Sequence, residues 1–282
     1  MESAADVWPN LFLVGAPRCG TTSLFTYLAE HPDVFGPAEK EPHYYDRDLM
    51  GPGGMGEEEY AALFATATSE RWRLDASALY LYSPEAPAAI ARDATDAHIV
   101  VSLRDPVELV ASWHRLVVAS GAETILDLES AIAAEPERRA GRGVPSNVAP
   151  IALMYTEIGS FAQNVDRWRA VFGDRVHVVR LESFDATVAQ LVRALGVEPV
   201  GERLPHLNPA RRTLGLAAVM NRSSPLRSAA RIVLPQGVRR SIWQRVNRAL
   251  TPPAAREPVD PEVRRRLEPL FADELELLAS FS

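Results

Sequence analysis

Near its start the chain has two glycines, Gly15 and Gly20, separated by four residues and lying between an apolar run and a segment with helical spacing. Residues 10–16 are apolar and rich in β-forming side chains, which predicts a buried strand, and residues 23–30 predict a helix. In a strand, glycine turn and helix of this spacing, backbone N–H groups and the helix N-terminus hold phosphate oxygens. We therefore expect a phosphate-binding loop here rather than an ordinary tight turn.

The residue after the second glycine limits which class of phosphate ligand the loop can bind. Kinases and nucleoside triphosphatases need a lysine there to reach the β- and γ-phosphates, and this chain has Thr21. The cation of the loop is instead Arg18. We therefore expect a phosphate that carries a different group at its end, and the loop does not require Mg²⁺. An atypical nucleotide or small-molecule kinase stays as an alternative.

A second candidate site follows the predicted strand at residues 98–103. Arg104 stands at the carboxyl end of this strand, where ligands of open α/β sheets bind. Ser112 lies two turns into the predicted helix 107–119, so a guanidinium and a hydroxyl would clamp a second phosphate. The alternative is that Asp105 and Pro106 only start a helix.

The remaining pattern alternates strands with helices, which predicts a central parallel sheet with helices on both faces. We expect one domain over residues 1–282, with an α/β core at about 10–200 and a partly helical, basic lid region at about 205–282. Further helices are predicted at 60–67, 84–93, 158–172 and 188–195, and a further strand at 175–181.

Three segments outside this core carry their own predictions. Residues 51–56 predict a flexible loop and residues 134–150 a mobile surface loop. The basic stretch 211–248 is a lid, an anionic-acceptor site, a nucleic-acid patch or a solvated face, of which we favour the lid or the solvated face. The chain ends in a helix with Asp260 as N-cap and apolar residues on one stripe, kinked at Pro269. That stripe comprises Val263, Leu267, Leu270, Phe271, Leu275 and Leu278.

Composition excludes several classes of protein. The formal charge of −7 argues against a nucleic-acid coat, and no apolar run approaches the length of a membrane span. The single cysteine, Cys19, excludes an internal disulfide. Lys40 is the only lysine among 30 basic side chains and precedes Glu41, so its position is either selected for chemistry or accidental.

Together these segments resemble the sulfotransferases that use 3′-phosphoadenosine 5′-phosphosulfate (PAPS). Residues 15–24 (GAPRCGTTSL) resemble the family's 5′-phosphosulfate loop, and residues 103–113 (LRDPVELVASW) resemble its 3′-phosphate motif. Residues 40–48 (KEPHYYDRD) resemble the segment with the catalytic acidic residue in the heparan-sulfate-type carbohydrate branch and its bacterial relatives. Residues 75–84 resemble the next block of the family.

The resemblance implies a role for each candidate residue. Glu41 would be the general base, with Lys40 on the sulfuryl oxygens and His43 contacting the acceptor or orienting Glu41; His43 packed as a structural residue is the alternative. Arg18 would hold the 5′-phosphate. The rest of the phosphate-binding loop would be completed by Cys19 (as a spacer without a chemical role), Gly20, Thr21, Thr22 and Ser23. The 3′-phosphate would be held by Arg104 and Ser112, with Arg211 or Arg212 also reaching the nucleotide.

Two departures from the family pattern bear on the acceptor. The loop cation is often lysine in the family and is Arg18 here, which keeps the charge. Ala76 and Ala78 stand where part of the heparan-sulfate branch has lysine and proline, which argues against an acceptor like heparan sulfate.

The resulting hypothesis is a cytoplasmic bacterial O-sulfotransferase that acts on a small molecule, a secondary metabolite or a glycan. It needs PAPS and no metal, releases adenosine 3′,5′-bisphosphate, and has no nucleic-acid or membrane partner. The acceptor stays open, as does the choice between monomer and homodimer. A non-catalytic nucleotide-binding module is the other alternative.

Overall fold

The computed structural model describes residues 8–51, 54–198 and 258–281. The predicted lid region up to residue 257, with Arg211 and Arg212, lies outside the described residues, as do Pro52 and Gly53 of the predicted loop 51–56. A five-stranded parallel sheet forms the centre, in the order β2-β3-β1-β4-β5. The strands are β1 (Leu11–Gly15), β2 (Val34–Phe35), β3 (Trp72–Ala76), β4 (His98–Leu103) and β5 (Val176–Arg180).

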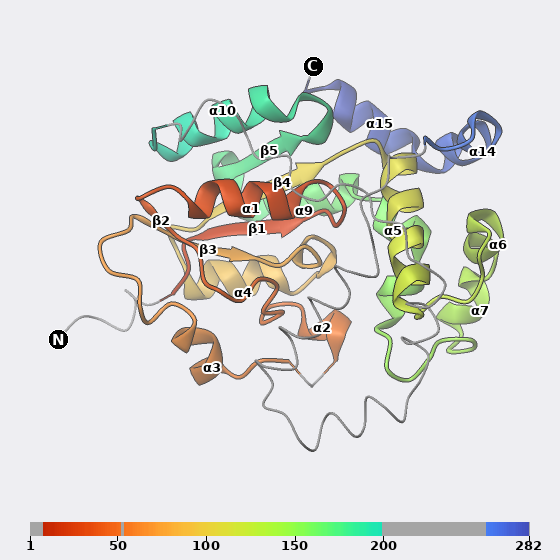
Figure 1. The fold of residues 1–282 in the computed structure, drawn as a ribbon, viewed down its shortest axis with the longest axis horizontal. Helices are drawn as coiled ribbons and strands as arrows, with labels where there is room; N and C mark the ends of the chain where they lie inside the picture. Colours follow the sequence, from red (N-terminus) through yellow and green to blue (C-terminus); the bar gives the residue numbers. More distant parts are fainter. Residues whose placement is uncertain (1–7, 52–53, 199–257, 282) are drawn as a thin grey trace.

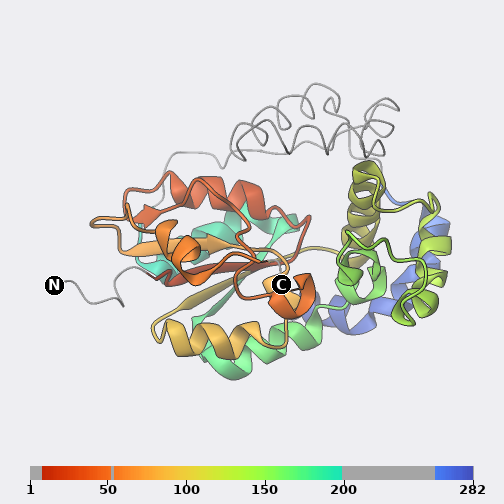
Figure 2. The same ribbon diagram turned by 90° about the horizontal axis from the view of Figure 1, so that it is seen from below.

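Helices cover both faces of the sheet, as predicted (Figures 1 and 2). One face packs against α1 (Thr21–Ala29) and α10 (Phe184–Leu195), the other against α4 (Ala86–Asp93) and α9 (Ala162–Phe172). Alternation along β1 makes this possible, since Leu11 and Leu13 face the first pair and Phe12 and Val14 the second. All four side chains are fully buried, as a strand covered on both faces requires.

The remaining helices lie at the carboxyl ends of the strands or in the connections between them (Figure 2). The longest is α5 (Pro106–Ser120), which Asp105 caps by accepting from the N–H of Glu108 at 2.9 Å. The N-cap expected of Asp105 and Pro106 is therefore present. The others are α2 (Arg47–Met50), α3 (Glu57–Ala62), α6 (Leu128–Ala133), α7 (Glu135–Arg139), α8 (Tyr155–Gly159), α14 (Pro261–Leu267) and α15 (Ala272–Ala279).

Several predicted elements are corrected. The helix expected at 158–172 is two helices, α8 and α9, separated at Ser160 and Phe161. The helix expected at 60–67 begins and ends earlier, at α3. The loop expected at 134–150 contains α7, because the buried Arg138 pairs with Glu123 at 2.7 Å.

The closing helix has the predicted cap and, except for Leu270, most of the predicted stripe. Asp260 accepts from the N–H groups of Glu262 and Val263, so the start is correct. A 3₁₀ turn at Glu268–Phe271, which contains Pro269, separates α14 from α15. This turn changes the helical phase, and Leu270 is therefore exposed while Phe271 is buried.

Candidate active site

The glycine turn leaves the sheet at its centre, at the end of β1. Gly15 has φ +149°, and a Cβ atom there would lie 2.5 Å from the carbonyl oxygen of Ala78. Gly20 has φ +85° and is the N-cap of α1. Both positions therefore require glycine, one because of a close backbone approach and both because of a positive φ.

The first turn of α1 is suited to an anion. Among the described residues, no side chain caps this helix, and its first turn contains no acidic residue. The first N–H groups of a helix have no partner within it and carry partial positive charge. Thr21 and Ser23 are buried at this end. The structure therefore has the predicted strand, glycine turn and helix, with a helix start that has no acidic residue in its first turn.

Arg18 and Ser112, predicted at two different phosphates, are in contact. The Nε of Arg18 donates to the Oγ of Ser112 at 3.1 Å, so α5 contacts the loop directly. Arg104 approaches from the end of β4, and its Nη1 donates to the carbonyl oxygen of Arg18 at 3.5 Å. The two predicted anion sites are therefore contiguous around Arg18.

Arg104 is a buried cation with incomplete hydrogen bonding. Its exposed fraction is 6%. Its two contacts are long, at 3.5 Å to Arg18 and at 3.4 Å to the carboxylate of Glu108. Its Nε has no hydrogen-bond partner among the described residues. Burying a charged donor without an acceptor costs free energy, and an anion bound here would supply the missing acceptors.

Cys19 is structural in this loop. Burial raises the pKa of its thiol strongly, even though the charges of Arg104 and Arg18 oppose the rise. The lowering that a helix N-terminus favours is therefore absent. Its carbonyl oxygen accepts from the hydroxyl of Ser102, which fastens the loop to β4. Burial therefore favours the protonated form of the thiol.

On the other side of the loop, residues 40–43 bring together the predicted catalytic side chains. The Nζ of Lys40 donates to Oε1 of Glu41 at 2.6 Å, and Nε2 of His43 lies 3.9 Å from Oε2 of the same carboxylate. Glu41 and His43 both have positive φ, at 61° and 54°. Such backbone strain occurs at functional sites more often than elsewhere. The Glu41 side chain is 43% exposed and therefore accessible.

A buried carboxylate that the sequence analysis missed holds His43. Nδ1 of His43 lies 2.8 Å from Oδ2 of Asp46, whose side chain is completely buried. Burial lowers the pKa of His43, but the hydrogen bond and charge of Asp46, with the charge of Glu41, outweigh it and raise the pKa. The only sequence signal for this pair is the i, i+3 spacing.

The end of β3 anchors this segment beside β1. The N–H of Glu41 donates to the carbonyl oxygen of Ala76 at 3.0 Å. The hydroxyl of Ser77 accepts from the N–H of His43 at 3.5 Å and donates to Asp75 at 3.0 Å. Asp75 also accepts from the hydroxyls of Tyr60 and Tyr80, at 2.6 and 3.0 Å. Tyr60 and Tyr80 are fully buried and Tyr44 stacks on Tyr60, so these aromatic residues belong to the core.

We expect Asp75 to make stability decline with rising pH. Burial raises its pKa to about 6, although the hydrogen bonds from Tyr60, Ser77 and Tyr80 oppose the rise. The folded protein binds this proton more tightly than the unfolded chain. The contribution of Asp75 is therefore full below about pH 4 and is lost as the pH rises through about 6. The change amounts to about 3 kcal/mol.

Urea unfolding of wild type and Asp75→Asn at about pH 4 and about pH 7 measures this effect. The difference in unfolding free energy between the two proteins should change by about 3 kcal/mol between these pH values, in favour of the wild type at the lower one. Asp166→Asn, at an exposed aspartate of α9, is the control and should show no such change. A difference for Asp75→Asn that is constant with pH would contradict the expectation.

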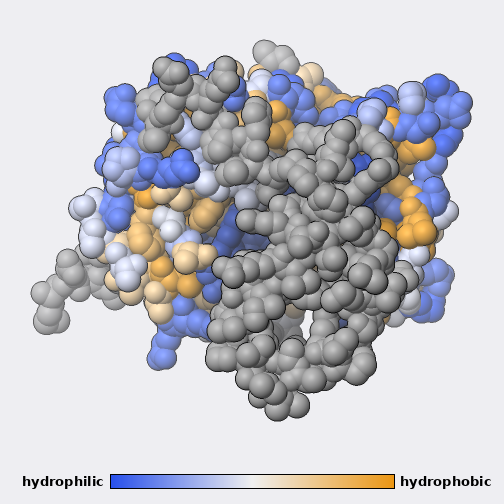
Figure 3. All heavy atoms as spheres, in the orientation of Figure 1, coloured by the Kyte–Doolittle hydropathy of each residue, from blue (hydrophilic) through white to orange (hydrophobic). Residues whose placement is uncertain are grey.

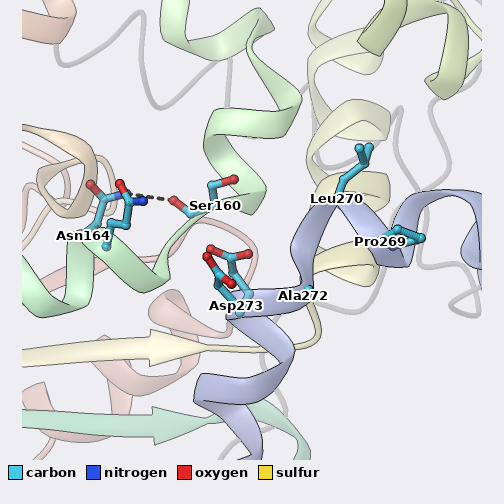
Figure 4. Close-up of a pocket in the computed structure, with 8 residues that line it drawn as sticks. Ser160, Asn164, Pro269, Leu270, Ala272 and Asp273 are labelled. Atoms are coloured by element: carbon cyan, nitrogen blue, oxygen red, sulfur yellow. Dashed lines mark hydrogen bonds between the residues drawn. The ribbon is translucent and has the colours of Figure 1, made fainter.

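Some features of the described residues lie outside this site. A cavity of about 380 Å³ between the start of α9 and the start of α15 contains none of the predicted site residues (Figure 4). Within residues 8–51, 54–198 and 258–281, no cluster of three His, Cys, Asp or Glu side chains is arranged to hold a metal ion. No described helix has the length and apolarity to cross a membrane.

The sequence comparisons agree with the resemblance seen in the motifs. A sequence model described as "Sulfotransferase family" matches residues 9–139. Human bifunctional heparan sulfate N-deacetylase/N-sulfotransferase 3 is 26% identical over 219 residues, which are 73% of this chain and 24% of that protein. Human heparan sulfate glucosamine 3-O-sulfotransferase 3A1 is 30% identical over 107 residues, which are 38% of this chain and 25% of that protein. The chain spans about a quarter of the length of these curated relatives.

The structural comparison extends over nearly the whole chain. A crystal structure of a sulfotransferase from Alicyclobacillus acidocaldarius aligns with a TM-score of 0.67 and 26% sequence identity. The alignment covers 97% of this chain and 95% of that one. The predicted fold class, a P-loop-containing α/β domain with a central parallel sheet, is confirmed.

Proposed function

Because residues 9–139 match a model of the sulfotransferase family, we propose that this chain transfers the sulfuryl group of PAPS to a hydroxyl. The single observation that carries the choice of donor is the buried Arg104. Its guanidinium lies at the rim of the glycine loop and has an Nε without a partner among the described residues. A 3′-phosphate would supply the missing acceptors, and PAPS has one in addition to its 5′-phosphosulfate.

The donor site divides between the loop and α5. The first N–H groups of α1, with Thr21, Thr22 and Ser23, would hold the 5′-phosphosulfate. Arg18 would stabilise charge on the 5′-phosphate as the nucleotide leaves. Arg104 and Ser112 would hold the 3′-phosphate, and the Arg18–Ser112 hydrogen bond links the two parts. When bound, PAPS supplies an activated sulfuryl group.

Glu41 would act as general base. Its accessible carboxylate stands beside the end of β1, where the loop begins, because its N–H is anchored to the end of β3. It would take the proton of the acceptor hydroxyl while the oxygen bonds to sulfur and the bond from sulfur to the 5′-phosphate oxygen breaks. General-base catalysis of this kind contributes about 10²–10⁴-fold.

Lys40 and His43 would prepare Glu41 and the transferred group. Lys40 would shield the sulfuryl oxygens as charge develops, and it donates a hydrogen bond to Glu41. His43, with a raised pKa and Asp46 behind it, offers Nε2 toward the Glu41 carboxylate. It would therefore orient the base, and Asp46 would fix the ring.

The acceptor would be a hydroxyl of a small molecule, a secondary metabolite or a glycan. The two human relatives act, by their names, on heparan sulfate. Ala76 and Ala78 replace the lysine and proline that part of that branch carries, and Ala76 adjoins the Glu41 anchor. We therefore favour an acceptor different from heparan sulfate.

Calorimetric titration with adenosine 3′,5′-bisphosphate in EDTA tests the proposed donor, with AMP and ATP titrated in parallel. We expect micromolar binding of the bisphosphate and much weaker binding of AMP and ATP. Tight binding of ATP that appears only when Mg²⁺ replaces EDTA would overturn the proposal and favour a kinase. Bisphosphate binding without turnover of PAPS across a panel of acceptors would favour a non-catalytic module.

A further inference from the structure

Glu108 on α5 lies between two arginines that are far apart in the sequence. Its Oε2 accepts from Nη2 of Arg104 at 3.4 Å. Its Oε1 accepts from Nη2 of Arg264 at 3.1 Å and from the N–H of Val259 at 3.4 Å. One carboxylate therefore connects the cation at the end of β4 to the start of the C-terminal helices.

Arg264 binds both acidic residues that follow Arg104. Its Nη1 donates to Asp105 at 2.9 Å, while its Nη2 binds Glu108. Asp105 in turn caps α5 with its other oxygen. The pairing with Asp105, together with Glu268 and Glu108, raises the pKa of Arg264 although its partial burial opposes this. The side chain is therefore a permanent cation, 29% exposed, turned toward α5.

Arg264 supplies half of the positive charge in this cluster. Arg104 and Arg264 carry two positive charges, while Asp105, Glu108 and Glu268 carry three negative ones. Without Arg264 the net charge would change from −1 to −2, and Arg104 would be the remaining cation beside Glu108. An acidic pair next to the phosphate site repels a phosphate, and it also draws the Arg104 guanidinium away from the ligand.

We propose that Arg264 is a positioning residue that reserves Arg104 for the 3′-phosphate and so determines selectivity for nucleotides that carry one. Arg264 does this by pairing with Asp105 and Glu108 at the start of α5. The inference rests on the proposed function, because it assigns the Arg104 site to the 3′-phosphate. It makes α14 part of the nucleotide site, although the sequence motif for that site ends at residue 113.

The neighbouring arginine of α14 offers a matched control. Arg266 lies two residues further along and binds Glu129 with Nε and Nη2 at 2.6 and 2.7 Å. Its side chain is 53% exposed, and its partner Glu129 lies on α6 rather than near Arg104. In Figure 3 the surface at the upper right, where Figure 1 places α14, is coloured mostly hydrophilic. Arg266→Gln thus removes the same charge from the same helix without touching the Arg104 cluster.

The test is the ratio of the dissociation constants for AMP and for adenosine 3′,5′-bisphosphate, measured by calorimetry with the full chain. Arg264→Gln should weaken bisphosphate binding on the order of tenfold and leave AMP binding unchanged, since AMP has no 3′-phosphate. Arg266→Gln should leave both constants at the wild-type values. Equal weakening of both nucleotides by Arg264→Gln would mean general structural damage and would overturn the proposal.

A double variant separates charge balance from packing. Glu108→Gln combined with Arg264→Gln removes the cation together with one carboxylate that it neutralises, so the net charge of the cluster returns to its wild-type value. Bisphosphate affinity should return to within about threefold of the wild type. Failure of the double variant to recover would overturn the assigned role of Glu108. If the wild-type chain binds neither nucleotide, the proposed function itself fails, and that result differs from each of these.

Discussion

Replacing Glu41 by Gln is expected to lower kcat by about 10²–10⁴-fold while leaving adenosine 3′,5′-bisphosphate binding unchanged. Glutamine keeps the shape of the side chain but does not take the proton of the acceptor hydroxyl. The loss corresponds to about 3–5 kcal/mol of transition-state stabilisation. The measurement is release of the bisphosphate from PAPS in the presence of phenolic, sugar and aliphatic hydroxyl acceptors.

Glu58→Gln, at an exposed position on α3, is the control for Glu41→Gln and should turn over PAPS at the wild-type rate. A Glu41→Gln protein with normal turnover would rule out this residue as the base. The remaining reading would then be that Glu41 is a surface carboxylate paired with Lys40.

Arg104→Ala is expected to weaken binding of adenosine 3′,5′-bisphosphate by about 10²-fold or more, and to abolish its advantage over AMP. A charge-assisted hydrogen bond from a buried guanidinium to phosphate contributes about 1.5–3 kcal/mol, and Arg104 has more than one donor to offer. The thermal midpoint should change little, because the hydrogen bonds from the Arg104 guanidinium to other described residues are long, at 3.4 and 3.5 Å.

Two further variants sharpen the result for Arg104. Arg104→Lys keeps a point charge but loses the planar fork, so it should recover part of the affinity. Arg92→Ala, at an arginine of α4 that is 72% exposed, should bind both nucleotides like the wild type. Unchanged discrimination between the bisphosphate and AMP in Arg104→Ala would assign the 3′-phosphate to other residues.

The elements that the sequence predicted well are those whose signal is local. Strands β1 and β4 are apolar runs, and α5 has its cap and its first-turn proline at one end and its terminal glycine at the other. The phosphate loop was predictable for the same reason, since its two glycines are required by the backbone conformation at Gly15 and Gly20.

The elements that the sequence did not reveal depend on distant partners. Strand β3 contains Arg73 and Asp75, so it does not look like a buried strand. Asp75 is accommodated there by hydroxyls of Tyr60, Ser77 and Tyr80. Helix α7 depends on the pairing of Arg138 with Glu123, and β2 has only two residues.

The candidate site divides in the same way. Arg18, Lys40, Glu41 and His43 could be proposed from motifs. Asp46 and Glu108 could not be proposed in this way, because their roles depend on the side chains that they contact in the fold. Arg264 lies more than 150 residues from its partners, and no local pattern distinguishes it from Arg265 or Arg266. Only the three-dimensional structure shows that these three arginines differ in their partners.

The order of the strands has a consequence for how such a protein diversifies. Because β1 lies between β3 and β4, the groups assigned to the acceptor depend on one neighbour of the loop and those assigned to the nucleotide on the other. The segment anchored on β3 can therefore accumulate substitutions while the β4 side stays under separate constraint. Exchange of residues 40–50 between relatives would then change the acceptor site and leave the donor site unchanged.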